Sequence, residues 1–286
     1  MRKLLRADMA RLFRDKLFYL AIAVLAGFEI MAISEGHRLI SRYHYPITML
    51  EYLFLYFQLL GLVFSVFSSL HLGRLYGDGT IRNKLVVGHN RCAVYFAAFL
   101  TMAAASVIMH AVSFLAGYLL GGTLLGGFPE SVSLWLWPFL CGILTGISYA
   151  AIFTLIGILC SQKAVTAVIS VLAAFFLLLG ATYLNSRLQQ PEMIPEYEYV
   201  IGEYSTEEEA GEPVRHEKMS RNPNYLEEGF KRDCFQFLFD ALPGGQSYLI
   251  ASLEVDKPGL YAGYSAMVIV LAAGAGCIAF RRKDIQ

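Results

Sequence analysis

The chain has 286 residues, of which 56% are hydrophobic and only 16% are charged, and its formal net charge is zero. A water-soluble domain normally carries about a quarter charged residues, so this composition excludes an ordinary soluble globular protein. The apolar residues fall in long charge-poor runs, without the alternation of polar and apolar residues that a transmembrane β-barrel requires. We therefore expect an all-α polytopic membrane protein.

Residues 1–16 are predicted to form an amphipathic helix on the cytosolic side of the membrane. Leu5, Met9, Leu12 and Phe13 share one helical face. The basic residues lie mostly around the other side, and they are Arg2, Lys3, Arg6, Arg11 and Arg14. Such a helix would lie in the membrane interface, with its basic face on anionic lipid headgroups or on a cytosolic partner. A merely positive flank of the first span explains the charges equally well.

Six apolar runs are long enough, or nearly so, to cross a bilayer core about 30 Å thick. They are Leu17–Ser34, Tyr52–Leu72, Cys92–Leu120, Val132–Ser161, Ala164–Leu184 and Gly259–Phe280. Glu29, in the first run, is a candidate gate or cation contact, although we favour a position near enough to the outer interface for solvation. His110, in the third run, is expected to make a packing hydrogen bond between spans. Phe57 and Phe64 are further pathway candidates, although core or lipid-facing aromatic residues are commoner.

The distribution of basic residues predicts the orientation of these spans. With the N-terminus inside, the cytosolic segments 1–16, 73–91, 161–163 and 281–286 together hold 14 Lys and Arg residues. The short outside loops, 35–51 and 121–131, hold only Arg38 and Arg42. The positive-inside rule therefore predicts that both termini lie in the cytosol.

The cysteines indicate no disulfide framework. Cys92, Cys141, Cys160 and Cys277 lie in or at the ends of spans, and Cys234 is the only cysteine of the outside region. A bacterial plasma-membrane protein without a structural disulfide fits this pattern. We expect no metal site and no catalytic residues in this chain.

Residues 185–258 are predicted to form an extracellular segment between the fifth and sixth spans. The stretch "EYEYVIGEYS" at 196–205 favours a short strand or hairpin, and 225–242 has the pattern of an amphipathic helix. A turn at "LPGGQ" (242–246) and an apolar run too short to span follow, which favours a re-entrant cap on the outer leaflet over a plain external loop. The cap residues would include Phe230, Phe237, Leu238, Pro243 and Gly244.

The insert "GRLYGDGTIRNKLVVGHNR" at 73–91 is short, basic and rich in glycine. It lacks the GxxxxGK[ST] spacing of a phosphate-binding loop, so ATP chemistry is expected in another subunit. With the following "VYFAAFL", it resembles the pattern G-[RK]-E-x-x-x-GTIRNKL-x-x-G-x-[ST]-R-x-x-x-Y of type-2 ABC exporter permeases. Leu75 and Asn90 depart from that pattern, and residues 222–246 give a second, weaker match.

This resemblance implies six spans, a pathway formed between two identical or different permease protomers, and a separate cytosolic ATPase that binds ATP and magnesium. It also implies that the insert contains the coupling helix that docks on this ATPase. The coupling residues would be Arg74, Asp78, Thr80, Arg82, Asn83, Lys84 and Arg91.

The local chemistry of the insert suits a docking helix. Gly79 permits a tight turn, Thr80 can cap the following helix, and Gly88 can end it. Arg82 and Lys84, together with the basic residue at the end of the insert, would present cations to an acidic groove, where charge complementarity sets register and partner choice.

Two other function classes remain open. A secondary transporter needs paired ionisable residues near the membrane midplane and usually internal repeats, and Glu29 and His110 are too few. An accessory or sensory subunit would bind a ligand through the acidic segment 185–258. ATPase-dependent flux distinguishes the exporter from both, and no feature of the sequence indicates a nucleic-acid partner.

Overall fold

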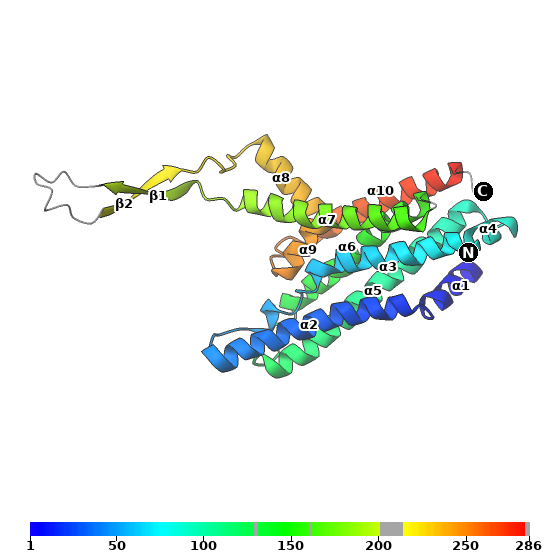
Figure 1. Cartoon of the computed structure of the whole chain (residues 1–286), viewed down its shortest axis with the longest axis horizontal. Helices are drawn as coiled ribbons and strands as arrows, with labels where there is room; N and C mark the ends of the chain where they lie inside the picture. Colours follow the sequence, from blue (N-terminus) through cyan, green and yellow to red (C-terminus); the bar gives the residue numbers. More distant parts are fainter. Residues whose placement is uncertain (129–130, 161, 201–213, 284–286) are drawn as a thin grey trace, which may run out of the picture. The chain divides into compact units, whose positions relative to one another are not determined.

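The computed structural model describes residues 1–128, 131–160, 162–200 and 214–283. These residues form two compact units, one made of Met1–Thr182 and Phe239–Gln286 and the other of Tyr183–Leu238. Six described helices are long and apolar enough to span a membrane, which confirms the predicted all-α polytopic fold (Figure 1). They are α2 (Lys16–Tyr43), α3 (Phe57–Gly77), α5 (Arg91–Leu124), α6 (Ser133–Leu159), α7 (Lys163–Leu188) and α10 (Pro258–Arg282).

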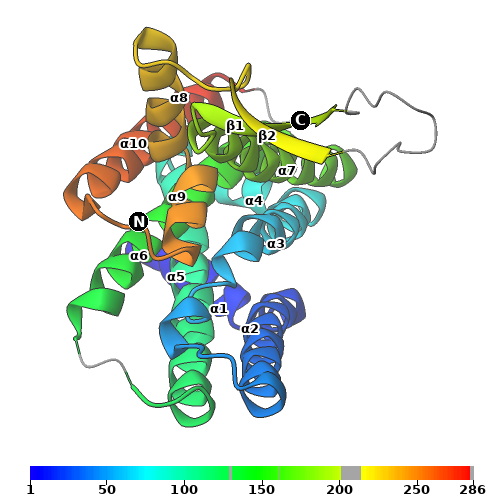
Figure 2. The same ribbon diagram turned by 90° about the vertical axis from the view of Figure 1, so that its left-hand side faces the viewer.

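The long helix α5 lies at the centre of the first unit. It packs against α2 on one side and against α6 on the other, and α6 in turn packs against α3 and α10 (Figure 2). Fully buried aromatic side chains fill the space between these helices, and Tyr149 and Phe153 of α6 have almost parallel rings.

Small residues allow the spans to approach closely. A Cβ atom on Gly142 would lie 2.8 Å from the ring of His110. A Cβ atom on Gly117 would lie 2.7 Å from a carboxylate oxygen of Glu29. Neither glycine could be replaced without displacing a polar side chain of a neighbouring helix.

The N-terminal helix α1 (Arg2–Leu12) packs on α5 through a face that differs from the predicted one. Its buried residues are Leu4, Asp8 and Leu12, whereas Phe13, which was predicted to share the apolar face, is 48% exposed. The apolar pattern could not predict that Asp8 is buried, because its carboxylate is paired with a residue far along the chain. The chain then turns into α2, whose first turn is capped by the Asp15 side chain accepting from the N–H of Leu17.

The remaining elements are short. The 3-10 helix η1 (Met49–Glu51) precedes α3, and α4 (Thr80–Val86) joins α3 to α5. In the second unit, β1 (Met193–Val200) pairs antiparallel with β2 (Val214–Arg221), so the predicted hairpin is present, although positions 201–205 of the predicted stretch lie outside the described residues.

Helices α8 (Phe230–Ala241) and α9 (Pro243–Ala251) follow the hairpin in the sequence. The predicted turn at 242–246 is wrong, because Leu242 is the N-cap of α9 and Pro243 occupies its first turn. Proline suits that position, since its fixed φ is helical and the first N–H of a helix has no intrahelical partner.

Cys92 and Cys277 form a disulfide, with their Cα atoms 5.3 Å apart. The expectation of no structural disulfide is therefore wrong. The two residues lie 185 positions apart in the sequence, at one end of α5 and of α10, and nothing in the sequence indicates that these two helices are neighbours.

Candidate functional site

The connection from α3 to α5 forms a compact helical corner around α4. Gly79 begins α4 with a φ of 64°, and Gly88 ends it with a φ of 93° and an N–H that donates to the carbonyl of Leu85. The predicted roles of both glycines are confirmed. The predicted Thr80 cap is wrong, because Gly79 is the N-cap, no side chain caps this helix, and Thr80 already belongs to its first turn.

Lys84, predicted to face a partner, points into the protein. Its side chain is only 9% exposed, and its ammonium donates to both carboxylate oxygens of Asp8 in α1 at 2.7 Å. Asp8 is 2% exposed and also accepts from Arg11 at 3.2 Å. The predicted presentation of this cation is therefore wrong, and the ion pair instead ties α4 to α1.

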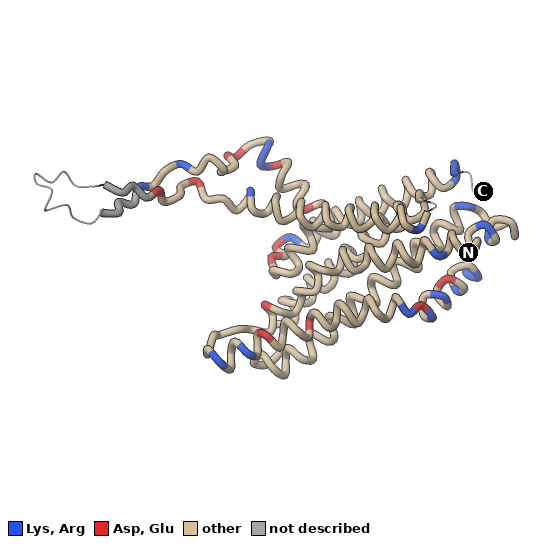
Figure 3. The backbone as a smooth tube through the Cα atoms, viewed as in Figure 1, with Lys and Arg blue, Asp and Glu red and all other residues tan. Residues whose placement is uncertain are grey.

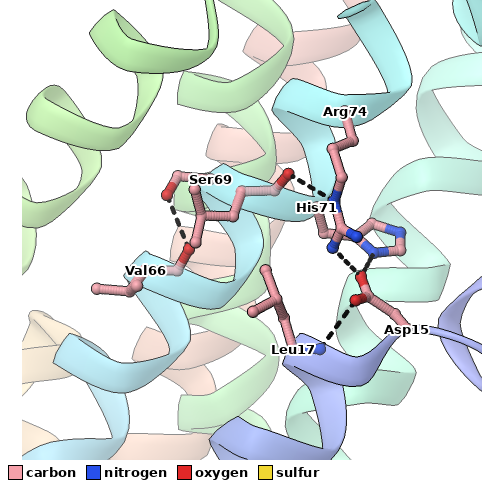
Figure 4. Close-up of polar contacts among 7 residues, drawn as sticks. Asp15, Leu17, Val66, Ser69, His71 and Arg74 are labelled. Carbon is pink, nitrogen blue, oxygen red and sulfur yellow. Dashed lines mark hydrogen bonds and ion pairs between the residues drawn. The ribbon is translucent and has the colours of Figure 1, made fainter. Parts of the chain in front are cut away.

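Arg74 likewise serves an internal contact, at the start of α2 (Figure 4). The buried carboxylate of Asp15 accepts from Arg74, from His71 Nδ1 at 2.7 Å and from the N–H of Leu17 at 3.0 Å. Burial raises the pKa of the Asp15 carboxyl, but these hydrogen bonds outweigh burial and hold its pKa well below the usual range. An ionised carboxylate therefore joins the start of α2 to the end of α3.

This shift gives stability a defined pH dependence. Because the folded-state pKa of Asp15 is depressed, its stabilisation is complete above the ordinary Asp value of about 3.9 and is lost as pH falls through that value toward the folded pKa. We expect Asp15→Asn to lower the free energy of unfolding by about 2 kcal/mol at neutral pH. Chemical unfolding should show a constant difference down to about pH 5 and a smaller one below it. Asp78→Asn, at an exposed position, is the control; a difference that grows on acidification contradicts this role.

Arg91 holds the C-terminal end of α10. Its guanidinium donates to the carbonyls of Phe280, at 3.4 Å, and Lys283. Lys283 in turn donates to the carbonyls of Ile158 and Leu159 at the end of α6, at 2.8 and 3.0 Å, and burial lowers its pKa. A cation at a helix C-terminus is favourable there. The predicted presentation of Arg91 to a partner is therefore also wrong.

The exposed side of α4 carries fewer of the predicted coupling cations than expected. We call the exposed residues Arg82, Asn83, Val86 and Val87 the α4 face. Val86 and Val87 are 78% and 77% exposed, the most exposed aliphatic pair among neighbouring residues of the insert. Asp78 is exposed beside this face, whereas Thr80 is half-buried.

A model of a family described as "ABC-2 family transporter protein" matches residues 4–181. The chain belongs to the ABC-2 transporter family. The matched range contains most of α1, all of α2 to α6 with the α4 face, and most of α7, and it includes the ion pairs of Asp8 and Asp15. No curated protein matches the chain. The protein is thus a multi-pass membrane permease subunit of an ABC transporter, and its family pairs with an ATP-binding cassette subunit.

Glu29 of the permease is fully buried, so the prediction that it lies near the outer interface and is solvated is wrong. One carboxylate oxygen accepts from the N–H of Tyr56 at 3.2 Å, and the other has no hydrogen-bond partner among the described residues. The physical reason is that α2 continues to Tyr43, far beyond the apolar run, and the segment that leads into α3 packs over Glu29.

His110 makes the predicted packing hydrogen bond. Its Nε2 lies 3.0 Å from the carbonyl of Phe139 in α6, and its Nδ1 lies 2.7 Å from the hydroxyl of Tyr56. Phe57 and Phe64 are fully buried in the core. The pathway role of these residues stays a prediction.

The cap residues fall into two groups. Pro243 and Gly244 are buried in α9, whereas Phe230, Phe237 and Leu238 are exposed on α8. The residue that fixes α9 was missed in the sequence. Gln246 is buried, and its amide oxygen accepts from Thr145 of α6 at 2.9 Å and from Ser265 of α10 at 2.6 Å, a role signalled only by one amide in an otherwise apolar stretch.

Proposed function

We propose that this permease forms, as a dimer, the substrate pathway of an ATP-driven exporter in a bacterial plasma membrane, and that the α4 face docks on a separate cytosolic ATPase. Lys and Arg gather at the end of the first unit that holds α1, α4 and the last turn of α10, which supports a cytosolic location for that end (Figure 3). The carrying observation is the α4 face itself, where two valines stand almost fully exposed beside a cation.

The exposed valines suit a partner because apolar side chains gain free energy when they leave water, on the order of 1.5–3 kcal/mol each. Arg82 adds a charge that can set the register of docking on an acidic groove. Lys84 and Arg74 are paired with carboxylates of the same chain, so they leave Arg82 as the basic side chain of the insert best placed for this contact.

The contacts behind the α4 face suit transmission of a movement into the spans. Lys84 ties α4 to α1 through Asp8, and α4 continues through short turns into α3 and α5. A displacement of α4 would therefore move several helices together. ATP binding by the partner changes the permease only when the docking contacts differ between its inward- and outward-open states.

The same proposal places α9 and Gln246 in a re-entrant cap at the outer end. Its support is the burial of α9 and the hydrogen bonds of Gln246 to α6 and α10, because backbone that is not a full span is tolerated at membrane depth only when protein surrounds it.

Co-purification with the ATPase tests the docking role. Val86→Asp combined with Val87→Asp should reduce recovery of the ATPase with the permease at least about tenfold, because it places two carboxylates in an apolar contact. Arg82→Glu should also reduce recovery of the ATPase, and this reduction should be larger at low salt than at high salt because salt screens the charge. Val132→Asp, at an exposed valine before α6, is the matched control. Undiminished assembly and ATPase-dependent flux in the double valine variant would overturn the proposal.

A further inference from the structure

Residues 1–16 sort their charges by sign. Both acids point inward, since Asp8 and Asp15 are buried and hold ion pairs within the protein. The basic residues all lie on the exposed side, and they are Arg2, Lys3, Arg6, Arg11, Arg14 and Lys16. The outward surface of this segment therefore carries cations and no carboxylate. We call these six basic residues the α1 basic surface.

An apolar edge runs beside the α1 basic surface. Met1, Leu5, Met9 and Phe13 follow one another at intervals of four residues, so they line up along one side of the helix. Met1 is 57% exposed, Phe13 is about half exposed, and Leu5 and Met9 are only partly buried. An apolar edge next to a basic surface is the pattern of a helix that lies in the lipid–water interface.

The position of α1 favours lipid over an acidic protein as the occupant of this surface. The helix is followed after a short turn by the span α2, in which Tyr19 and Leu20, near its start, are exposed. The hydroxyl of Tyr19 donates to the carbonyl of Phe13, which fixes the turn between α1 and the span. The apolar edge of α1 is thus continuous with the part of α2 that enters the bilayer.

The inward side of α1 contacts the buried side of α4, behind the α4 face. Asp8 holds Lys84, which lies between the exposed Asn83 and the partly buried Leu85 in the sequence of α4. Asp15 holds His71 and Arg74 at the end of α3. Binding that orders or moves α1 is therefore passed to α4 through Asp8, and Asp15, the N-cap of α2, ties the turn after α1 to α3.

We propose that anionic lipid headgroups bind the α1 basic surface and, through the Asp8–Lys84 ion pair, set the position of the α4 face. The permease then couples to its ATPase only when anionic lipid holds α1 in place. The inference rests on the proposed orientation and on the proposed role of α4, but it concerns a different ligand and is tested on the permease alone. Each cation near an anionic surface contributes on the order of a fivefold change in binding.

Hydrogen exchange of the full-length permease in nanodiscs tests the inference. The discs contain phosphatidylcholine alone or an equal mixture of phosphatidylcholine and phosphatidylglycerol. Phosphatidylglycerol should slow amide exchange in α1 and also in α4, on the order of tenfold for the wild type. The triple variant Arg2→Gln, Lys3→Gln, Arg6→Gln should lose both responses. Lys84→Met should keep the response in α1 and lose it in α4.

The controls separate this effect from a general influence of lipid on the fold. Arg38→Gln with Arg42→Gln removes two exposed cations from the other end of α2 and should leave both responses intact. Equal exchange of α1 in the two lipids would overturn lipid binding, and a response of α4 that survives Lys84→Met would overturn transmission through the ion pair. Because no ATPase is present, these outcomes are independent of whether the α4 face docks as proposed.

Discussion

Replacing Asp8 with alanine is expected to lower the free energy of unfolding of the permease by about 3–5 kcal/mol. The reason is that the substitution leaves the Lys84 ammonium buried without its carboxylate. The Lys84 side chain is 9% exposed and its ammonium donates to both oxygens of Asp8, so the lost contacts cannot be replaced by solvent without opening the packing of α1 on α4 and α5. Thermal unfolding in detergent, followed by the fluorescence of a thiol-independent dye, measures the loss.

A double substitution separates a buried unpaired charge from a simple loss of packing. Asp8→Leu with Lys84→Met removes both charges, and it should recover most of the stability because well-packed apolar pairs often replace buried ion pairs without cost. Arg82→Ala, on the exposed side of the same helix, should change stability by no more than about 0.5 kcal/mol. Equal losses in the single and double variants would show that the pair does not act as a charge pair.

The six spans could be predicted because a bilayer-spanning helix is a local property of length and hydropathy. The helix ends could not. The apolar run ends at Ser34, but α2 continues to Tyr43, because polar residues such as Arg38 are fully compatible with a helix that has left the bilayer. The same extension explains why the position of Glu29 was predicted wrongly. Glu29 lies near the end of the apolar run, but α2 continues for 14 residues beyond it, and its side chain is buried.

The coupling insert could be located, and its glycine turns were predicted correctly, because positive φ is a local demand. The direction of its basic side chains could not be predicted. Lys84 finds its carboxylate 76 positions away and Arg91 finds its carbonyls about 190 positions away, and both partners depend on how the helices assemble. The sequence shows which residues are charged, but the partner of each charge depends on how α1 and α10 pack.

The close approach of α9 to its neighbours was equally invisible in the sequence, and it makes Gly245→Ala the second large effect that we expect. A Cβ atom on Gly245 would lie 1.8 Å from the carbonyl oxygen of Phe239, and one on Gly244 would lie 2.1 Å from the carbonyl oxygen of Leu177. Backbone atoms cannot rotate aside as a flexible side chain can, so α9 must shift as a whole. The shift would break the hydrogen bonds that Gln246 makes to α6 and α10.

We expect Gly245→Ala to cost about 3 kcal/mol or more, from overpacking together with buried hydrogen bonds left unmade. Gly263→Ala is the matched control, because it adds the same methyl group to a helical glycine of α10 where no described atom lies within 4 Å of the added Cβ. That control should be neutral or slightly stabilising, since alanine favours the helix. Thermal unfolding of the two variants in the same detergent decides the matter. Equal midpoints would mean that α9 does not approach its neighbours this closely, and α9 would then be no fixed part of an outer cap.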